Sequence, residues 1–165
     1  MTKGRFTLIL ATITVLVLLA SAPASLREAW RRGGFYLFSR DFIEGIPRRL
    51  SGPGRFRFVF QPLTAILLGI RSGREDARKG QPPFLAAVLL HPVLRRDLLK
   101  SGFQTIVNLL LMGILLDSLF QWILLGTSYP GAAVVVGPVL IAVPYSVTRA
   151  LTNRIARARH GNAAP

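Results

Sequence analysis

Two long apolar runs near the C-terminus, separated by only six residues, constrain the fold more than any other feature of the sequence. Phe103–Leu125 has 23 residues with one charged side chain, and Ala132–Leu151 has 20 residues. At about 1.5 Å per helical residue, each run can cross a hydrocarbon layer of about 30 Å. The connecting segment Gly126–Gly131 is uncharged and long enough only to turn the chain back. The sequence therefore predicts a transmembrane helical hairpin at residues 103–151.

A third apolar run, Phe6–Ala24, has 19 residues and follows Lys3 and Arg5. Its small residues at the end resemble a signal-peptide cleavage site. Cleavage after Ala22, however, would leave Pro23 at the new N-terminus, and every cut in this segment would leave several arginines directly downstream, which opposes export. We therefore expect an uncleaved membrane anchor at residues 1–24.

Residues 25–102 are predicted to form a basic, amphipathic interfacial region. Ser25 and Glu28 have the spacing of a capping box, which predicts that a helix begins at Ser25. Aromatic residues and arginines are interleaved after it, as is typical of a helix among lipid headgroups; a helix packed on the other segments is the alternative. Phe58–Ile70 is apolar but has only 13 residues, which favours an interfacial or re-entrant segment.

The remaining segments of the chain are predicted from their polarity. Residues 71–81 are polar and are expected to form a salt-bridged, solvated turn around Glu75 and Asp76, with a functional loop as the alternative. Residues 152–165 are basic and then small and polar, which predicts a flexible tail.

The charged residues indicate how the chain is oriented in the membrane. The sequence has 21 Lys and Arg against 7 Asp and Glu. Because the basic residues flank apolar runs, we expect contact with anionic lipids rather than with nucleic acid. Of these basic residues, 15 lie between Ser25 and Gly102, 4 lie from Arg149 onward, and none lies in the hairpin turn. The positive-inside rule then places both ends of the hairpin in the cytoplasm and Tyr129 outside.

Two arrangements of the N-terminal part remain open. If residues 25–102 stay inside, the chain has three spans and its N-terminus lies outside. If Phe58–Ile70 crosses, the chain has four spans, its N-terminus lies inside, and eight arginines lie outside. The first arrangement violates the positive-inside rule less, so the charge distribution favours it.

Asp117 is the only acidic residue within the three long runs. A charged residue near the middle of the bilayer costs about 2.5–3.5 kcal/mol, so it is expected to face protein or water. Gln121 lies on the same helical face, whereas Asn108 lies on the opposite face, which predicts protein neighbours on two sides. Asp117, Gln121 and Asn108 form a candidate intramembrane polar site. A proton or cation site is one interpretation; hydrogen bonding between helices is favoured, because no basic partner is evident at the depth of Asp117.

Other polar residues carry weaker predictions. Arg149 is expected to extend toward the headgroups, with a hydrogen bond to Asn108 as the alternative. His91 and His160 have no carboxylate or second histidine at metal-ligand spacing, and are expected at the surface or in an interface. The candidate headgroup contacts are Arg31, Arg32, Arg71, Arg74 and Arg78. The chain has no cysteine, which excludes disulfides and thiolate sites, and no pattern in it predicts a cofactor, a metal site or catalytic residues.

Several short motifs resemble a family of small uncharacterised bacterial inner-membrane proteins. The resemblance covers about residues 55–157. It rests on Phe60-Gln61-Pro62, the stretch Gly69-Ile70-Arg71-x-Gly73-x-x-Asp76-Ala77-Arg78-x-Gly80-x-Pro82-Pro83, Leu116-Asp117 with Gln121, Tyr129-Pro130-Gly131, Pro144-Tyr145 and Asn153-Arg154. It implies an inner-membrane location and brings no known activity.

The sequence as a whole predicts an all-α, multi-pass membrane protein. The favoured function is that of a non-enzymatic membrane subunit or scaffold, acting as a homo-oligomer or with a partner membrane subunit. A small transporter or ion-coupled component that uses Asp117 is one alternative. A membrane-bound enzyme acting on lipid headgroups is the other.

Overall fold

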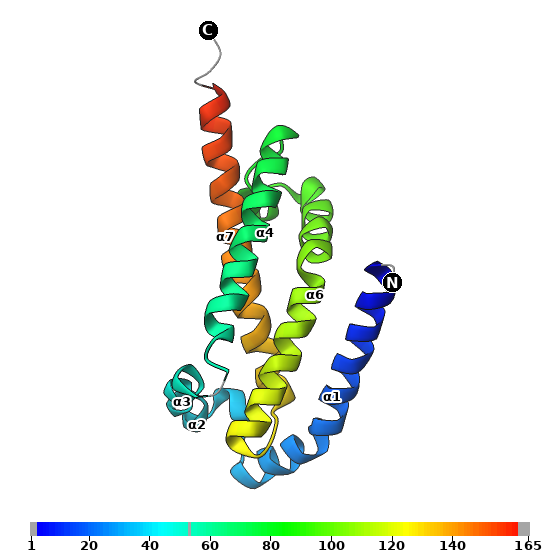
Figure 1. The fold of residues 1–165 in the computed structure, drawn as a ribbon, viewed down its shortest axis with the longest axis vertical. Coiled ribbons are helices and arrows are strands. Elements are labelled where there is room, and N and C mark those ends of the chain that lie inside the picture. The colour runs from blue at the N-terminus through cyan, green and yellow to red at the C-terminus, as the bar shows by residue number, and fades with distance from the viewer. Residues whose placement is uncertain (1–2, 53, 162–165) are drawn as a thin grey trace. The chain divides into compact units, whose positions relative to one another are not determined.

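The computed structural model describes residues 3–52 and 54–161, without the side chains of residues 3, 48, 49, 160 and 161. Its regular structure is helical throughout these residues, so the predicted all-α class is confirmed (Figure 1). The elements are α1 (Lys3–Arg32), the 3-10 helix η1 (Tyr36–Phe38), α2 (Arg40–Glu44), α3 (Ile46–Ser51), α4 (Arg57–Arg78), α5 (Phe84–Leu90), α6 (Pro92–Leu125) and α7 (Pro130–Gly161).

Three of the described helices are long and apolar enough to cross a membrane, namely α1, α6 and α7. This agrees with the three predicted spans and with a multi-pass membrane protein. The helix ends differ from those expected. α1 continues through Ser25 to Arg32, so the prediction that a helix begins at Ser25 is wrong. α6 begins at Pro92, before the apolar run, and α7 continues beyond residue 151. The tail is therefore helical as far as the structure describes it.

These differences have one physical cause. The apolar runs mark the part of each helix that suits hydrocarbon, whereas the helix itself continues wherever the backbone can keep its hydrogen bonds. Arginine, leucine and alanine are good helix formers, and they are common just outside the apolar runs. The pattern of hydropathy consequently underestimates the length of each helix.

The largest correction concerns α4. The expected short apolar segment followed by a solvated turn is one continuous helix of 22 residues, Arg57–Arg78. The polar residues from Arg71 onward are its last two turns, so the loop expected at residues 71–81 is wrong over most of its length. α4 ends at Arg78, and Gly80, two residues later, has a φ of 67°, the left-handed conformation of the glycine that commonly follows a helix.

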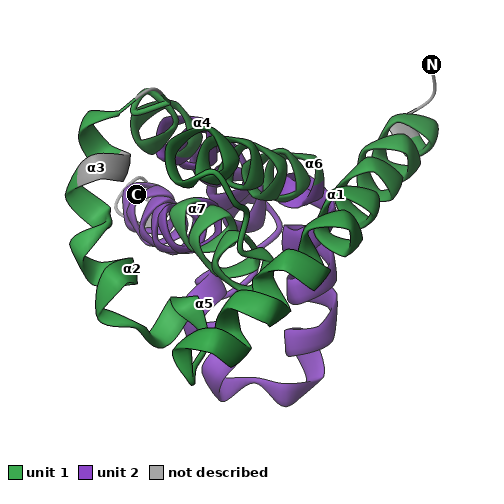
Figure 2. Cartoon of the chain, turned by 90° about the horizontal axis from the view of Figure 1, so that it is seen from below, with its two compact units in different colours: residues 1–61, 108–140 green, residues 62–107, 141–165 purple. Residues whose placement is uncertain are grey.

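The chain divides into two compact units, and each is described here by itself (Figure 2). Unit 1 comprises residues 1–61 and 108–140 and contains α1, the short helices η1, α2 and α3, and the hairpin turn. Unit 2 comprises residues 62–107 and 141–165 and contains α5, most of α4, and the ends of α6 and α7 that lie farthest from the turn along the chain.

In unit 1, the segment that follows α1 lies at the hairpin turn. The rings of Tyr36 and Tyr129 stack with centroids 3.9 Å apart and an angle of 13° between their planes. Both rings belong to a buried cluster with Ala132, against which Leu37, Phe42 and Leu125 pack. The arrangement in which residues 25–102 all stay on the side opposite Tyr129 does not agree with this contact.

In unit 2, two glycines of α4 allow its backbone to approach α7 closely. A Cβ atom added to Gly69 would lie 2.8 Å from the carbonyl oxygen of Tyr145, and one added to Gly73 would lie 2.4 Å from that of Arg149. Small residues four positions apart are a recurrent means of close helix packing in membranes. The motif Gly69-x-x-x-Gly73 is therefore a packing surface of α4.

Candidate intramembrane polar site

Asp117 is paired with an arginine that comes from another helix of unit 1. Arg57 is the first residue of α4, and its Nη2 lies 2.5 Å from Oδ1 of Asp117. The side chains are 3% and 0% exposed. The guanidinium carbon of Arg57 also lies 4.7 Å from the ring centroid of Phe58, within the range of a cation–π contact. The expectation that Asp117 has no basic partner is therefore wrong, because α4 begins beside it.

Gln121 connects this ion pair to the hairpin turn. Its Nε2 donates a hydrogen bond to Oδ2 of Asp117, and its Oε1 accepts one from the backbone N–H of Tyr129, at 2.8 Å. Burial raises the pKa of the Tyr129 phenol, so this ring remains neutral at physiological pH. Arg57, Asp117, Gln121 and the Tyr129 backbone form a continuous polar chain that fixes α4, α6 and the turn together.

Asn108 does not take part in this chain of contacts. Its Oδ1 accepts a hydrogen bond from Oγ1 of Thr7 in α1, at 2.8 Å. The two polar faces of α6 thus meet two different helices, α4 at Asp117 and α1 at Asn108. The prediction that α6 has protein neighbours on two sides is confirmed, but the three predicted residues belong to two separate contacts.

Unit 2 contains a second buried ion pair, between Arg149 of α7 and Asp76 of α4. The guanidinium donates from Nε to Oδ2 at 2.6 Å and from Nη2 to Oδ1 at 2.9 Å. It also donates to the hydroxyls of Tyr145 and Ser101, at 3.1 and 3.2 Å. Arg149 is 3% exposed, so the expectation that it extends toward the headgroups is wrong. Its hydrogen-bond partner is the carboxylate of Asp76, whereas Asn108 was the alternative considered from the sequence.

The five arginines predicted to contact headgroups are all exposed. Arg31 and Arg32 lie at the end of α1 in unit 1, where Arg32 forms ion pairs with Glu28 and Asp41. The other three, Arg71, Arg74 and Arg78, lie on α4 in unit 2.

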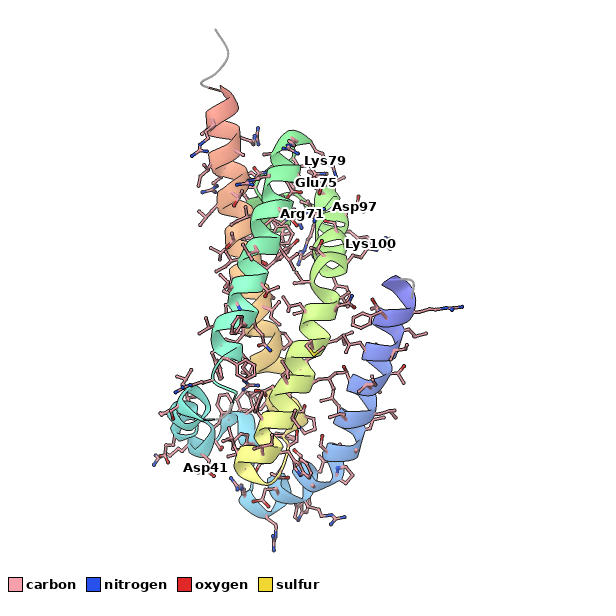
Figure 3. The ribbon with its side chains drawn as sticks, viewed as in Figure 1. Asp41, Arg71, Glu75, Lys79, Asp97 and Lys100 are labelled. Atoms are coloured by element: carbon pink, nitrogen blue, oxygen red, sulfur yellow. The ribbon has the colours of Figure 1, made fainter. Side chains whose placement is uncertain are left out.

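The charged residues near the end of α4 differ in exposure. Figure 3 shows Arg71, Glu75 and Lys79 there, and Glu75 pairs with Lys79 at 2.7 Å. This pair agrees with the salt bridging predicted for this stretch, whereas Asp76 is buried instead of solvated.

The histidine whose side chain the structure describes, His91, belongs to neither buried pair. His91 is exposed at the end of α5, as predicted. The side chain of His160 lies outside the described residues.

Sequence reasoning missed Arg57 and Asp76 as partners of buried charges. A signal for the second pair was present, because an arginine inside an apolar run demands an acidic neighbour. Comparison of the chain with protein-family models, with curated proteins and with solved structures finds no match. The functional interpretation consequently rests on the geometry of the two units.

Proposed function

We propose that this chain is a non-enzymatic subunit or scaffold of the bacterial cytoplasmic membrane. The observation that supports this proposal is the engagement of Asp117 by both Arg57 and Gln121. A carboxylate that relays protons or cations must exchange its partners during a cycle. Asp117 is instead surrounded by groups that neutralise its charge and satisfy its oxygens, as expected of a residue that holds helices together.

The proposed location is supported by the basic residues that flank the spans and by the resemblance of residues 55–157 to bacterial inner-membrane proteins. Long stretches of α1 expose apolar side chains, among them Leu8, Leu16 and Leu19. Such a surface suits lipid or a helix of another membrane subunit, including a second copy of this chain.

The test compares single and double replacements of the ion pair. Asp117→Leu alone leaves a buried guanidinium without its carboxylate, which costs about 3–5 kcal/mol in buried pairs. Arg57→Met combined with Asp117→Leu removes both charges, and we expect most of the stability to return. Each variant is heated in detergent, and size-exclusion chromatography measures how much protein remains folded. Asp41→Leu, which affects an exposed ion pair, is the control and is expected to cost less than about 1 kcal/mol.

Function is tested in cells lacking the chromosomal copy. If Asp117 only holds helices together, the stable double variant should restore growth and recover the same partner proteins as wild type. A stable double variant or Asp117→Asn variant that assembles normally but loses a transport phenotype would instead identify Asp117 as a proton or cation site. A double variant as unstable as Asp117→Leu would show that the pair does not stabilise the fold.

A further inference from the structure

Unit 1 contains a pocket of about 580 Å³ between α1, α6 and the hairpin turn. This volume lies in the range of pockets that bind small organic ligands, about 300–1,000 Å³. Three of the four lining residues from α1 are small, Ala20, Ser21 and Ala24. They leave space opposite the larger side chains of α6, Leu115, Leu119 and Trp122.

The wall of the pocket carries no charged side chain, so its interior suits a hydrocarbon chain. Trp122 is 65% exposed at the wall, and it precedes the turn by one helical turn, where an indole is expected at a membrane–water interface. A molecule in this pocket would thus have its apolar part among the helices and its polar part near the turn.

Two hydroxyl groups of wall residues lack a hydrogen-bond partner among the described residues. They belong to Ser118 and Ser128, both more than nine-tenths buried. A buried hydroxyl without a partner costs about 1–3 kcal/mol. An ester carbonyl in the pocket would accept hydrogen bonds from such hydroxyls.

Exposed arginines continue the pocket wall toward the end of α1. Residues 17, 20, 21 and 24 of α1 line the pocket, and the helical spacing of three to four residues extends this face to Arg27 and Arg31. Both arginines are exposed. The acidic residue of the same turn, Glu28, forms an ion pair with Arg32, so Arg27 and Arg31 supply the net charge beside the pocket.

We propose that this pocket binds one glycerophospholipid with an anionic headgroup. An acyl chain occupies the apolar interior, an ester carbonyl accepts hydrogen bonds from Ser118 and Ser128, and the phosphate lies beside Arg27 and Arg31. The binding site is distinct from the proposed scaffold role, because it involves neither Arg57 nor Asp117.

Native mass spectrometry of the purified full chain tests the proposal. Delipidated protein is titrated with dioleoyl phosphatidylglycerol, with dioleoyl phosphatidylcholine and with glycerol phosphate. We expect one phosphatidylglycerol molecule to remain bound under activation, with about tenfold tighter binding than phosphatidylcholine, which corresponds to about 1.4 kcal/mol. Glycerol phosphate, which has the charge but no acyl chain, should not compete at similar concentrations.

Two sets of variants distinguish the pocket for the acyl chain from the arginines that contact the headgroup. Ala20→Leu with Ala24→Leu fills the pocket and should abolish retention, whereas Val15→Leu, elsewhere on α1, should not. Arg27→Gln with Arg31→Gln should weaken phosphatidylglycerol binding about tenfold and remove the preference over phosphatidylcholine, whereas Arg40→Gln should change neither.

The proposal is overturned if wild type retains no phospholipid, if the filled pocket retains as much as wild type, or if glycerol phosphate competes as well as the lipid. Should the filled variant fail to fold, the arginine variants decide: unchanged lipid preference in them contradicts the proposed headgroup site.

Discussion

At the scale of single residues, the two buried arginines are neutralised in different ways. Arg149 meets Asp76 through two parallel hydrogen bonds, the geometry for which the planar guanidinium is suited. Arg57 approaches Oδ1 of Asp117 through Nη2, and the other carboxylate oxygen of Asp117 accepts a hydrogen bond from Gln121. The first pair therefore depends on the shape of arginine, and the second depends on a polar chain that reaches the turn.

We expect Asp76 to matter far more for stability than its neighbour Glu75. Asp76→Asn keeps the size of the side chain but leaves Arg149 buried without a negative charge, which should cost about 3–5 kcal/mol. Glu75→Gln is the matched control, because Glu75 forms an exposed pair with Lys79 and should cost less than about 1 kcal/mol. Thermal unfolding of both variants in detergent measures the difference. Equal losses would mean that the buried pair contributes no more than the exposed one.

The sequence predicted part of this site correctly. The spacing of Asp117 and Gln121 placed them on one helical face, because periodicity within a helix follows from the sequence alone. The partners Arg57 and Asp76 lie on a different helix, and pairing across helices depends on register and distance that periodicity does not contain. Nothing local in the sequence distinguishes Arg57, which is buried, from Arg55, which is exposed.

At the scale of helices, close packing of α4 on α7 depends on glycine. Gly73 has room for no side chain, because an added Cβ would meet the carbonyl oxygen of Arg149 at 2.4 Å. This oxygen belongs to the backbone and cannot move without shifting α7. The helices would have to separate, and the nearby pair between Arg149 and Asp76 would be strained with them.

Gly73→Ala should therefore destabilise the protein by about 1–3 kcal/mol, the usual cost of overpacking. The matched control is Gly131→Ala, since a Cβ at Gly131 of α7 meets nothing within 4 Å and alanine favours helix by about 1 kcal/mol over glycine. Melting temperatures of the two variants are compared with wild type. A Gly73→Ala variant as stable as wild type would contradict the close approach of α4 and α7.

The helix boundaries were harder to predict than the helices themselves. Hydropathy falls sharply at Arg71, so the sequence predicts that the helical segment ends there, yet the helix continues to Arg78. Hydropathy responds to the environment of side chains, and α4 passes from apolar to charged surroundings without a change of backbone conformation. Gly80 follows the end of α4, but the sequence alone does not distinguish it from Gly69 and Gly73, which lie inside the helix.

At the scale of the whole molecule, the stacking of Tyr36 on Tyr129 bears on the membrane topology. If α1 and the hairpin both cross the membrane, this contact places the residues after α1 on the same side as the turn. α6 begins on the other side, because its 34 residues run continuously to the turn. The chain between residues 52 and 92 must then cross once. α4 has the length to do so, at about 33 Å, whereas α5 has only 7 residues, although α4 is not among the three described helices that are apolar enough to cross by themselves. We therefore expect four crossings with both termini in the cytoplasm.

Alkaline phosphatase fusions test this topology, because the enzyme is active only outside the cytoplasm. We expect activity for fusions at Tyr129 and at Gly34, and none at Gly80 or Gly161. Gly34 is decisive, since the arrangement with three crossings and a cytoplasmic region 25–102 predicts no activity there. High activity at Gly80 would contradict both arrangements.

The pairing of Asp76 with Arg149 also has a consequence for the synthesis of the protein. Arg149 follows Asp76 by 73 residues, and translation adds about 5–20 residues per second, so about 4–15 s pass before the carboxylate can meet its partner. During this interval the carboxylate of Asp76 lacks the arginine that neutralises it in the folded protein. α4 is thus expected to leave the translocon late, or to wait at the membrane surface, and to insert only when α7 has been made.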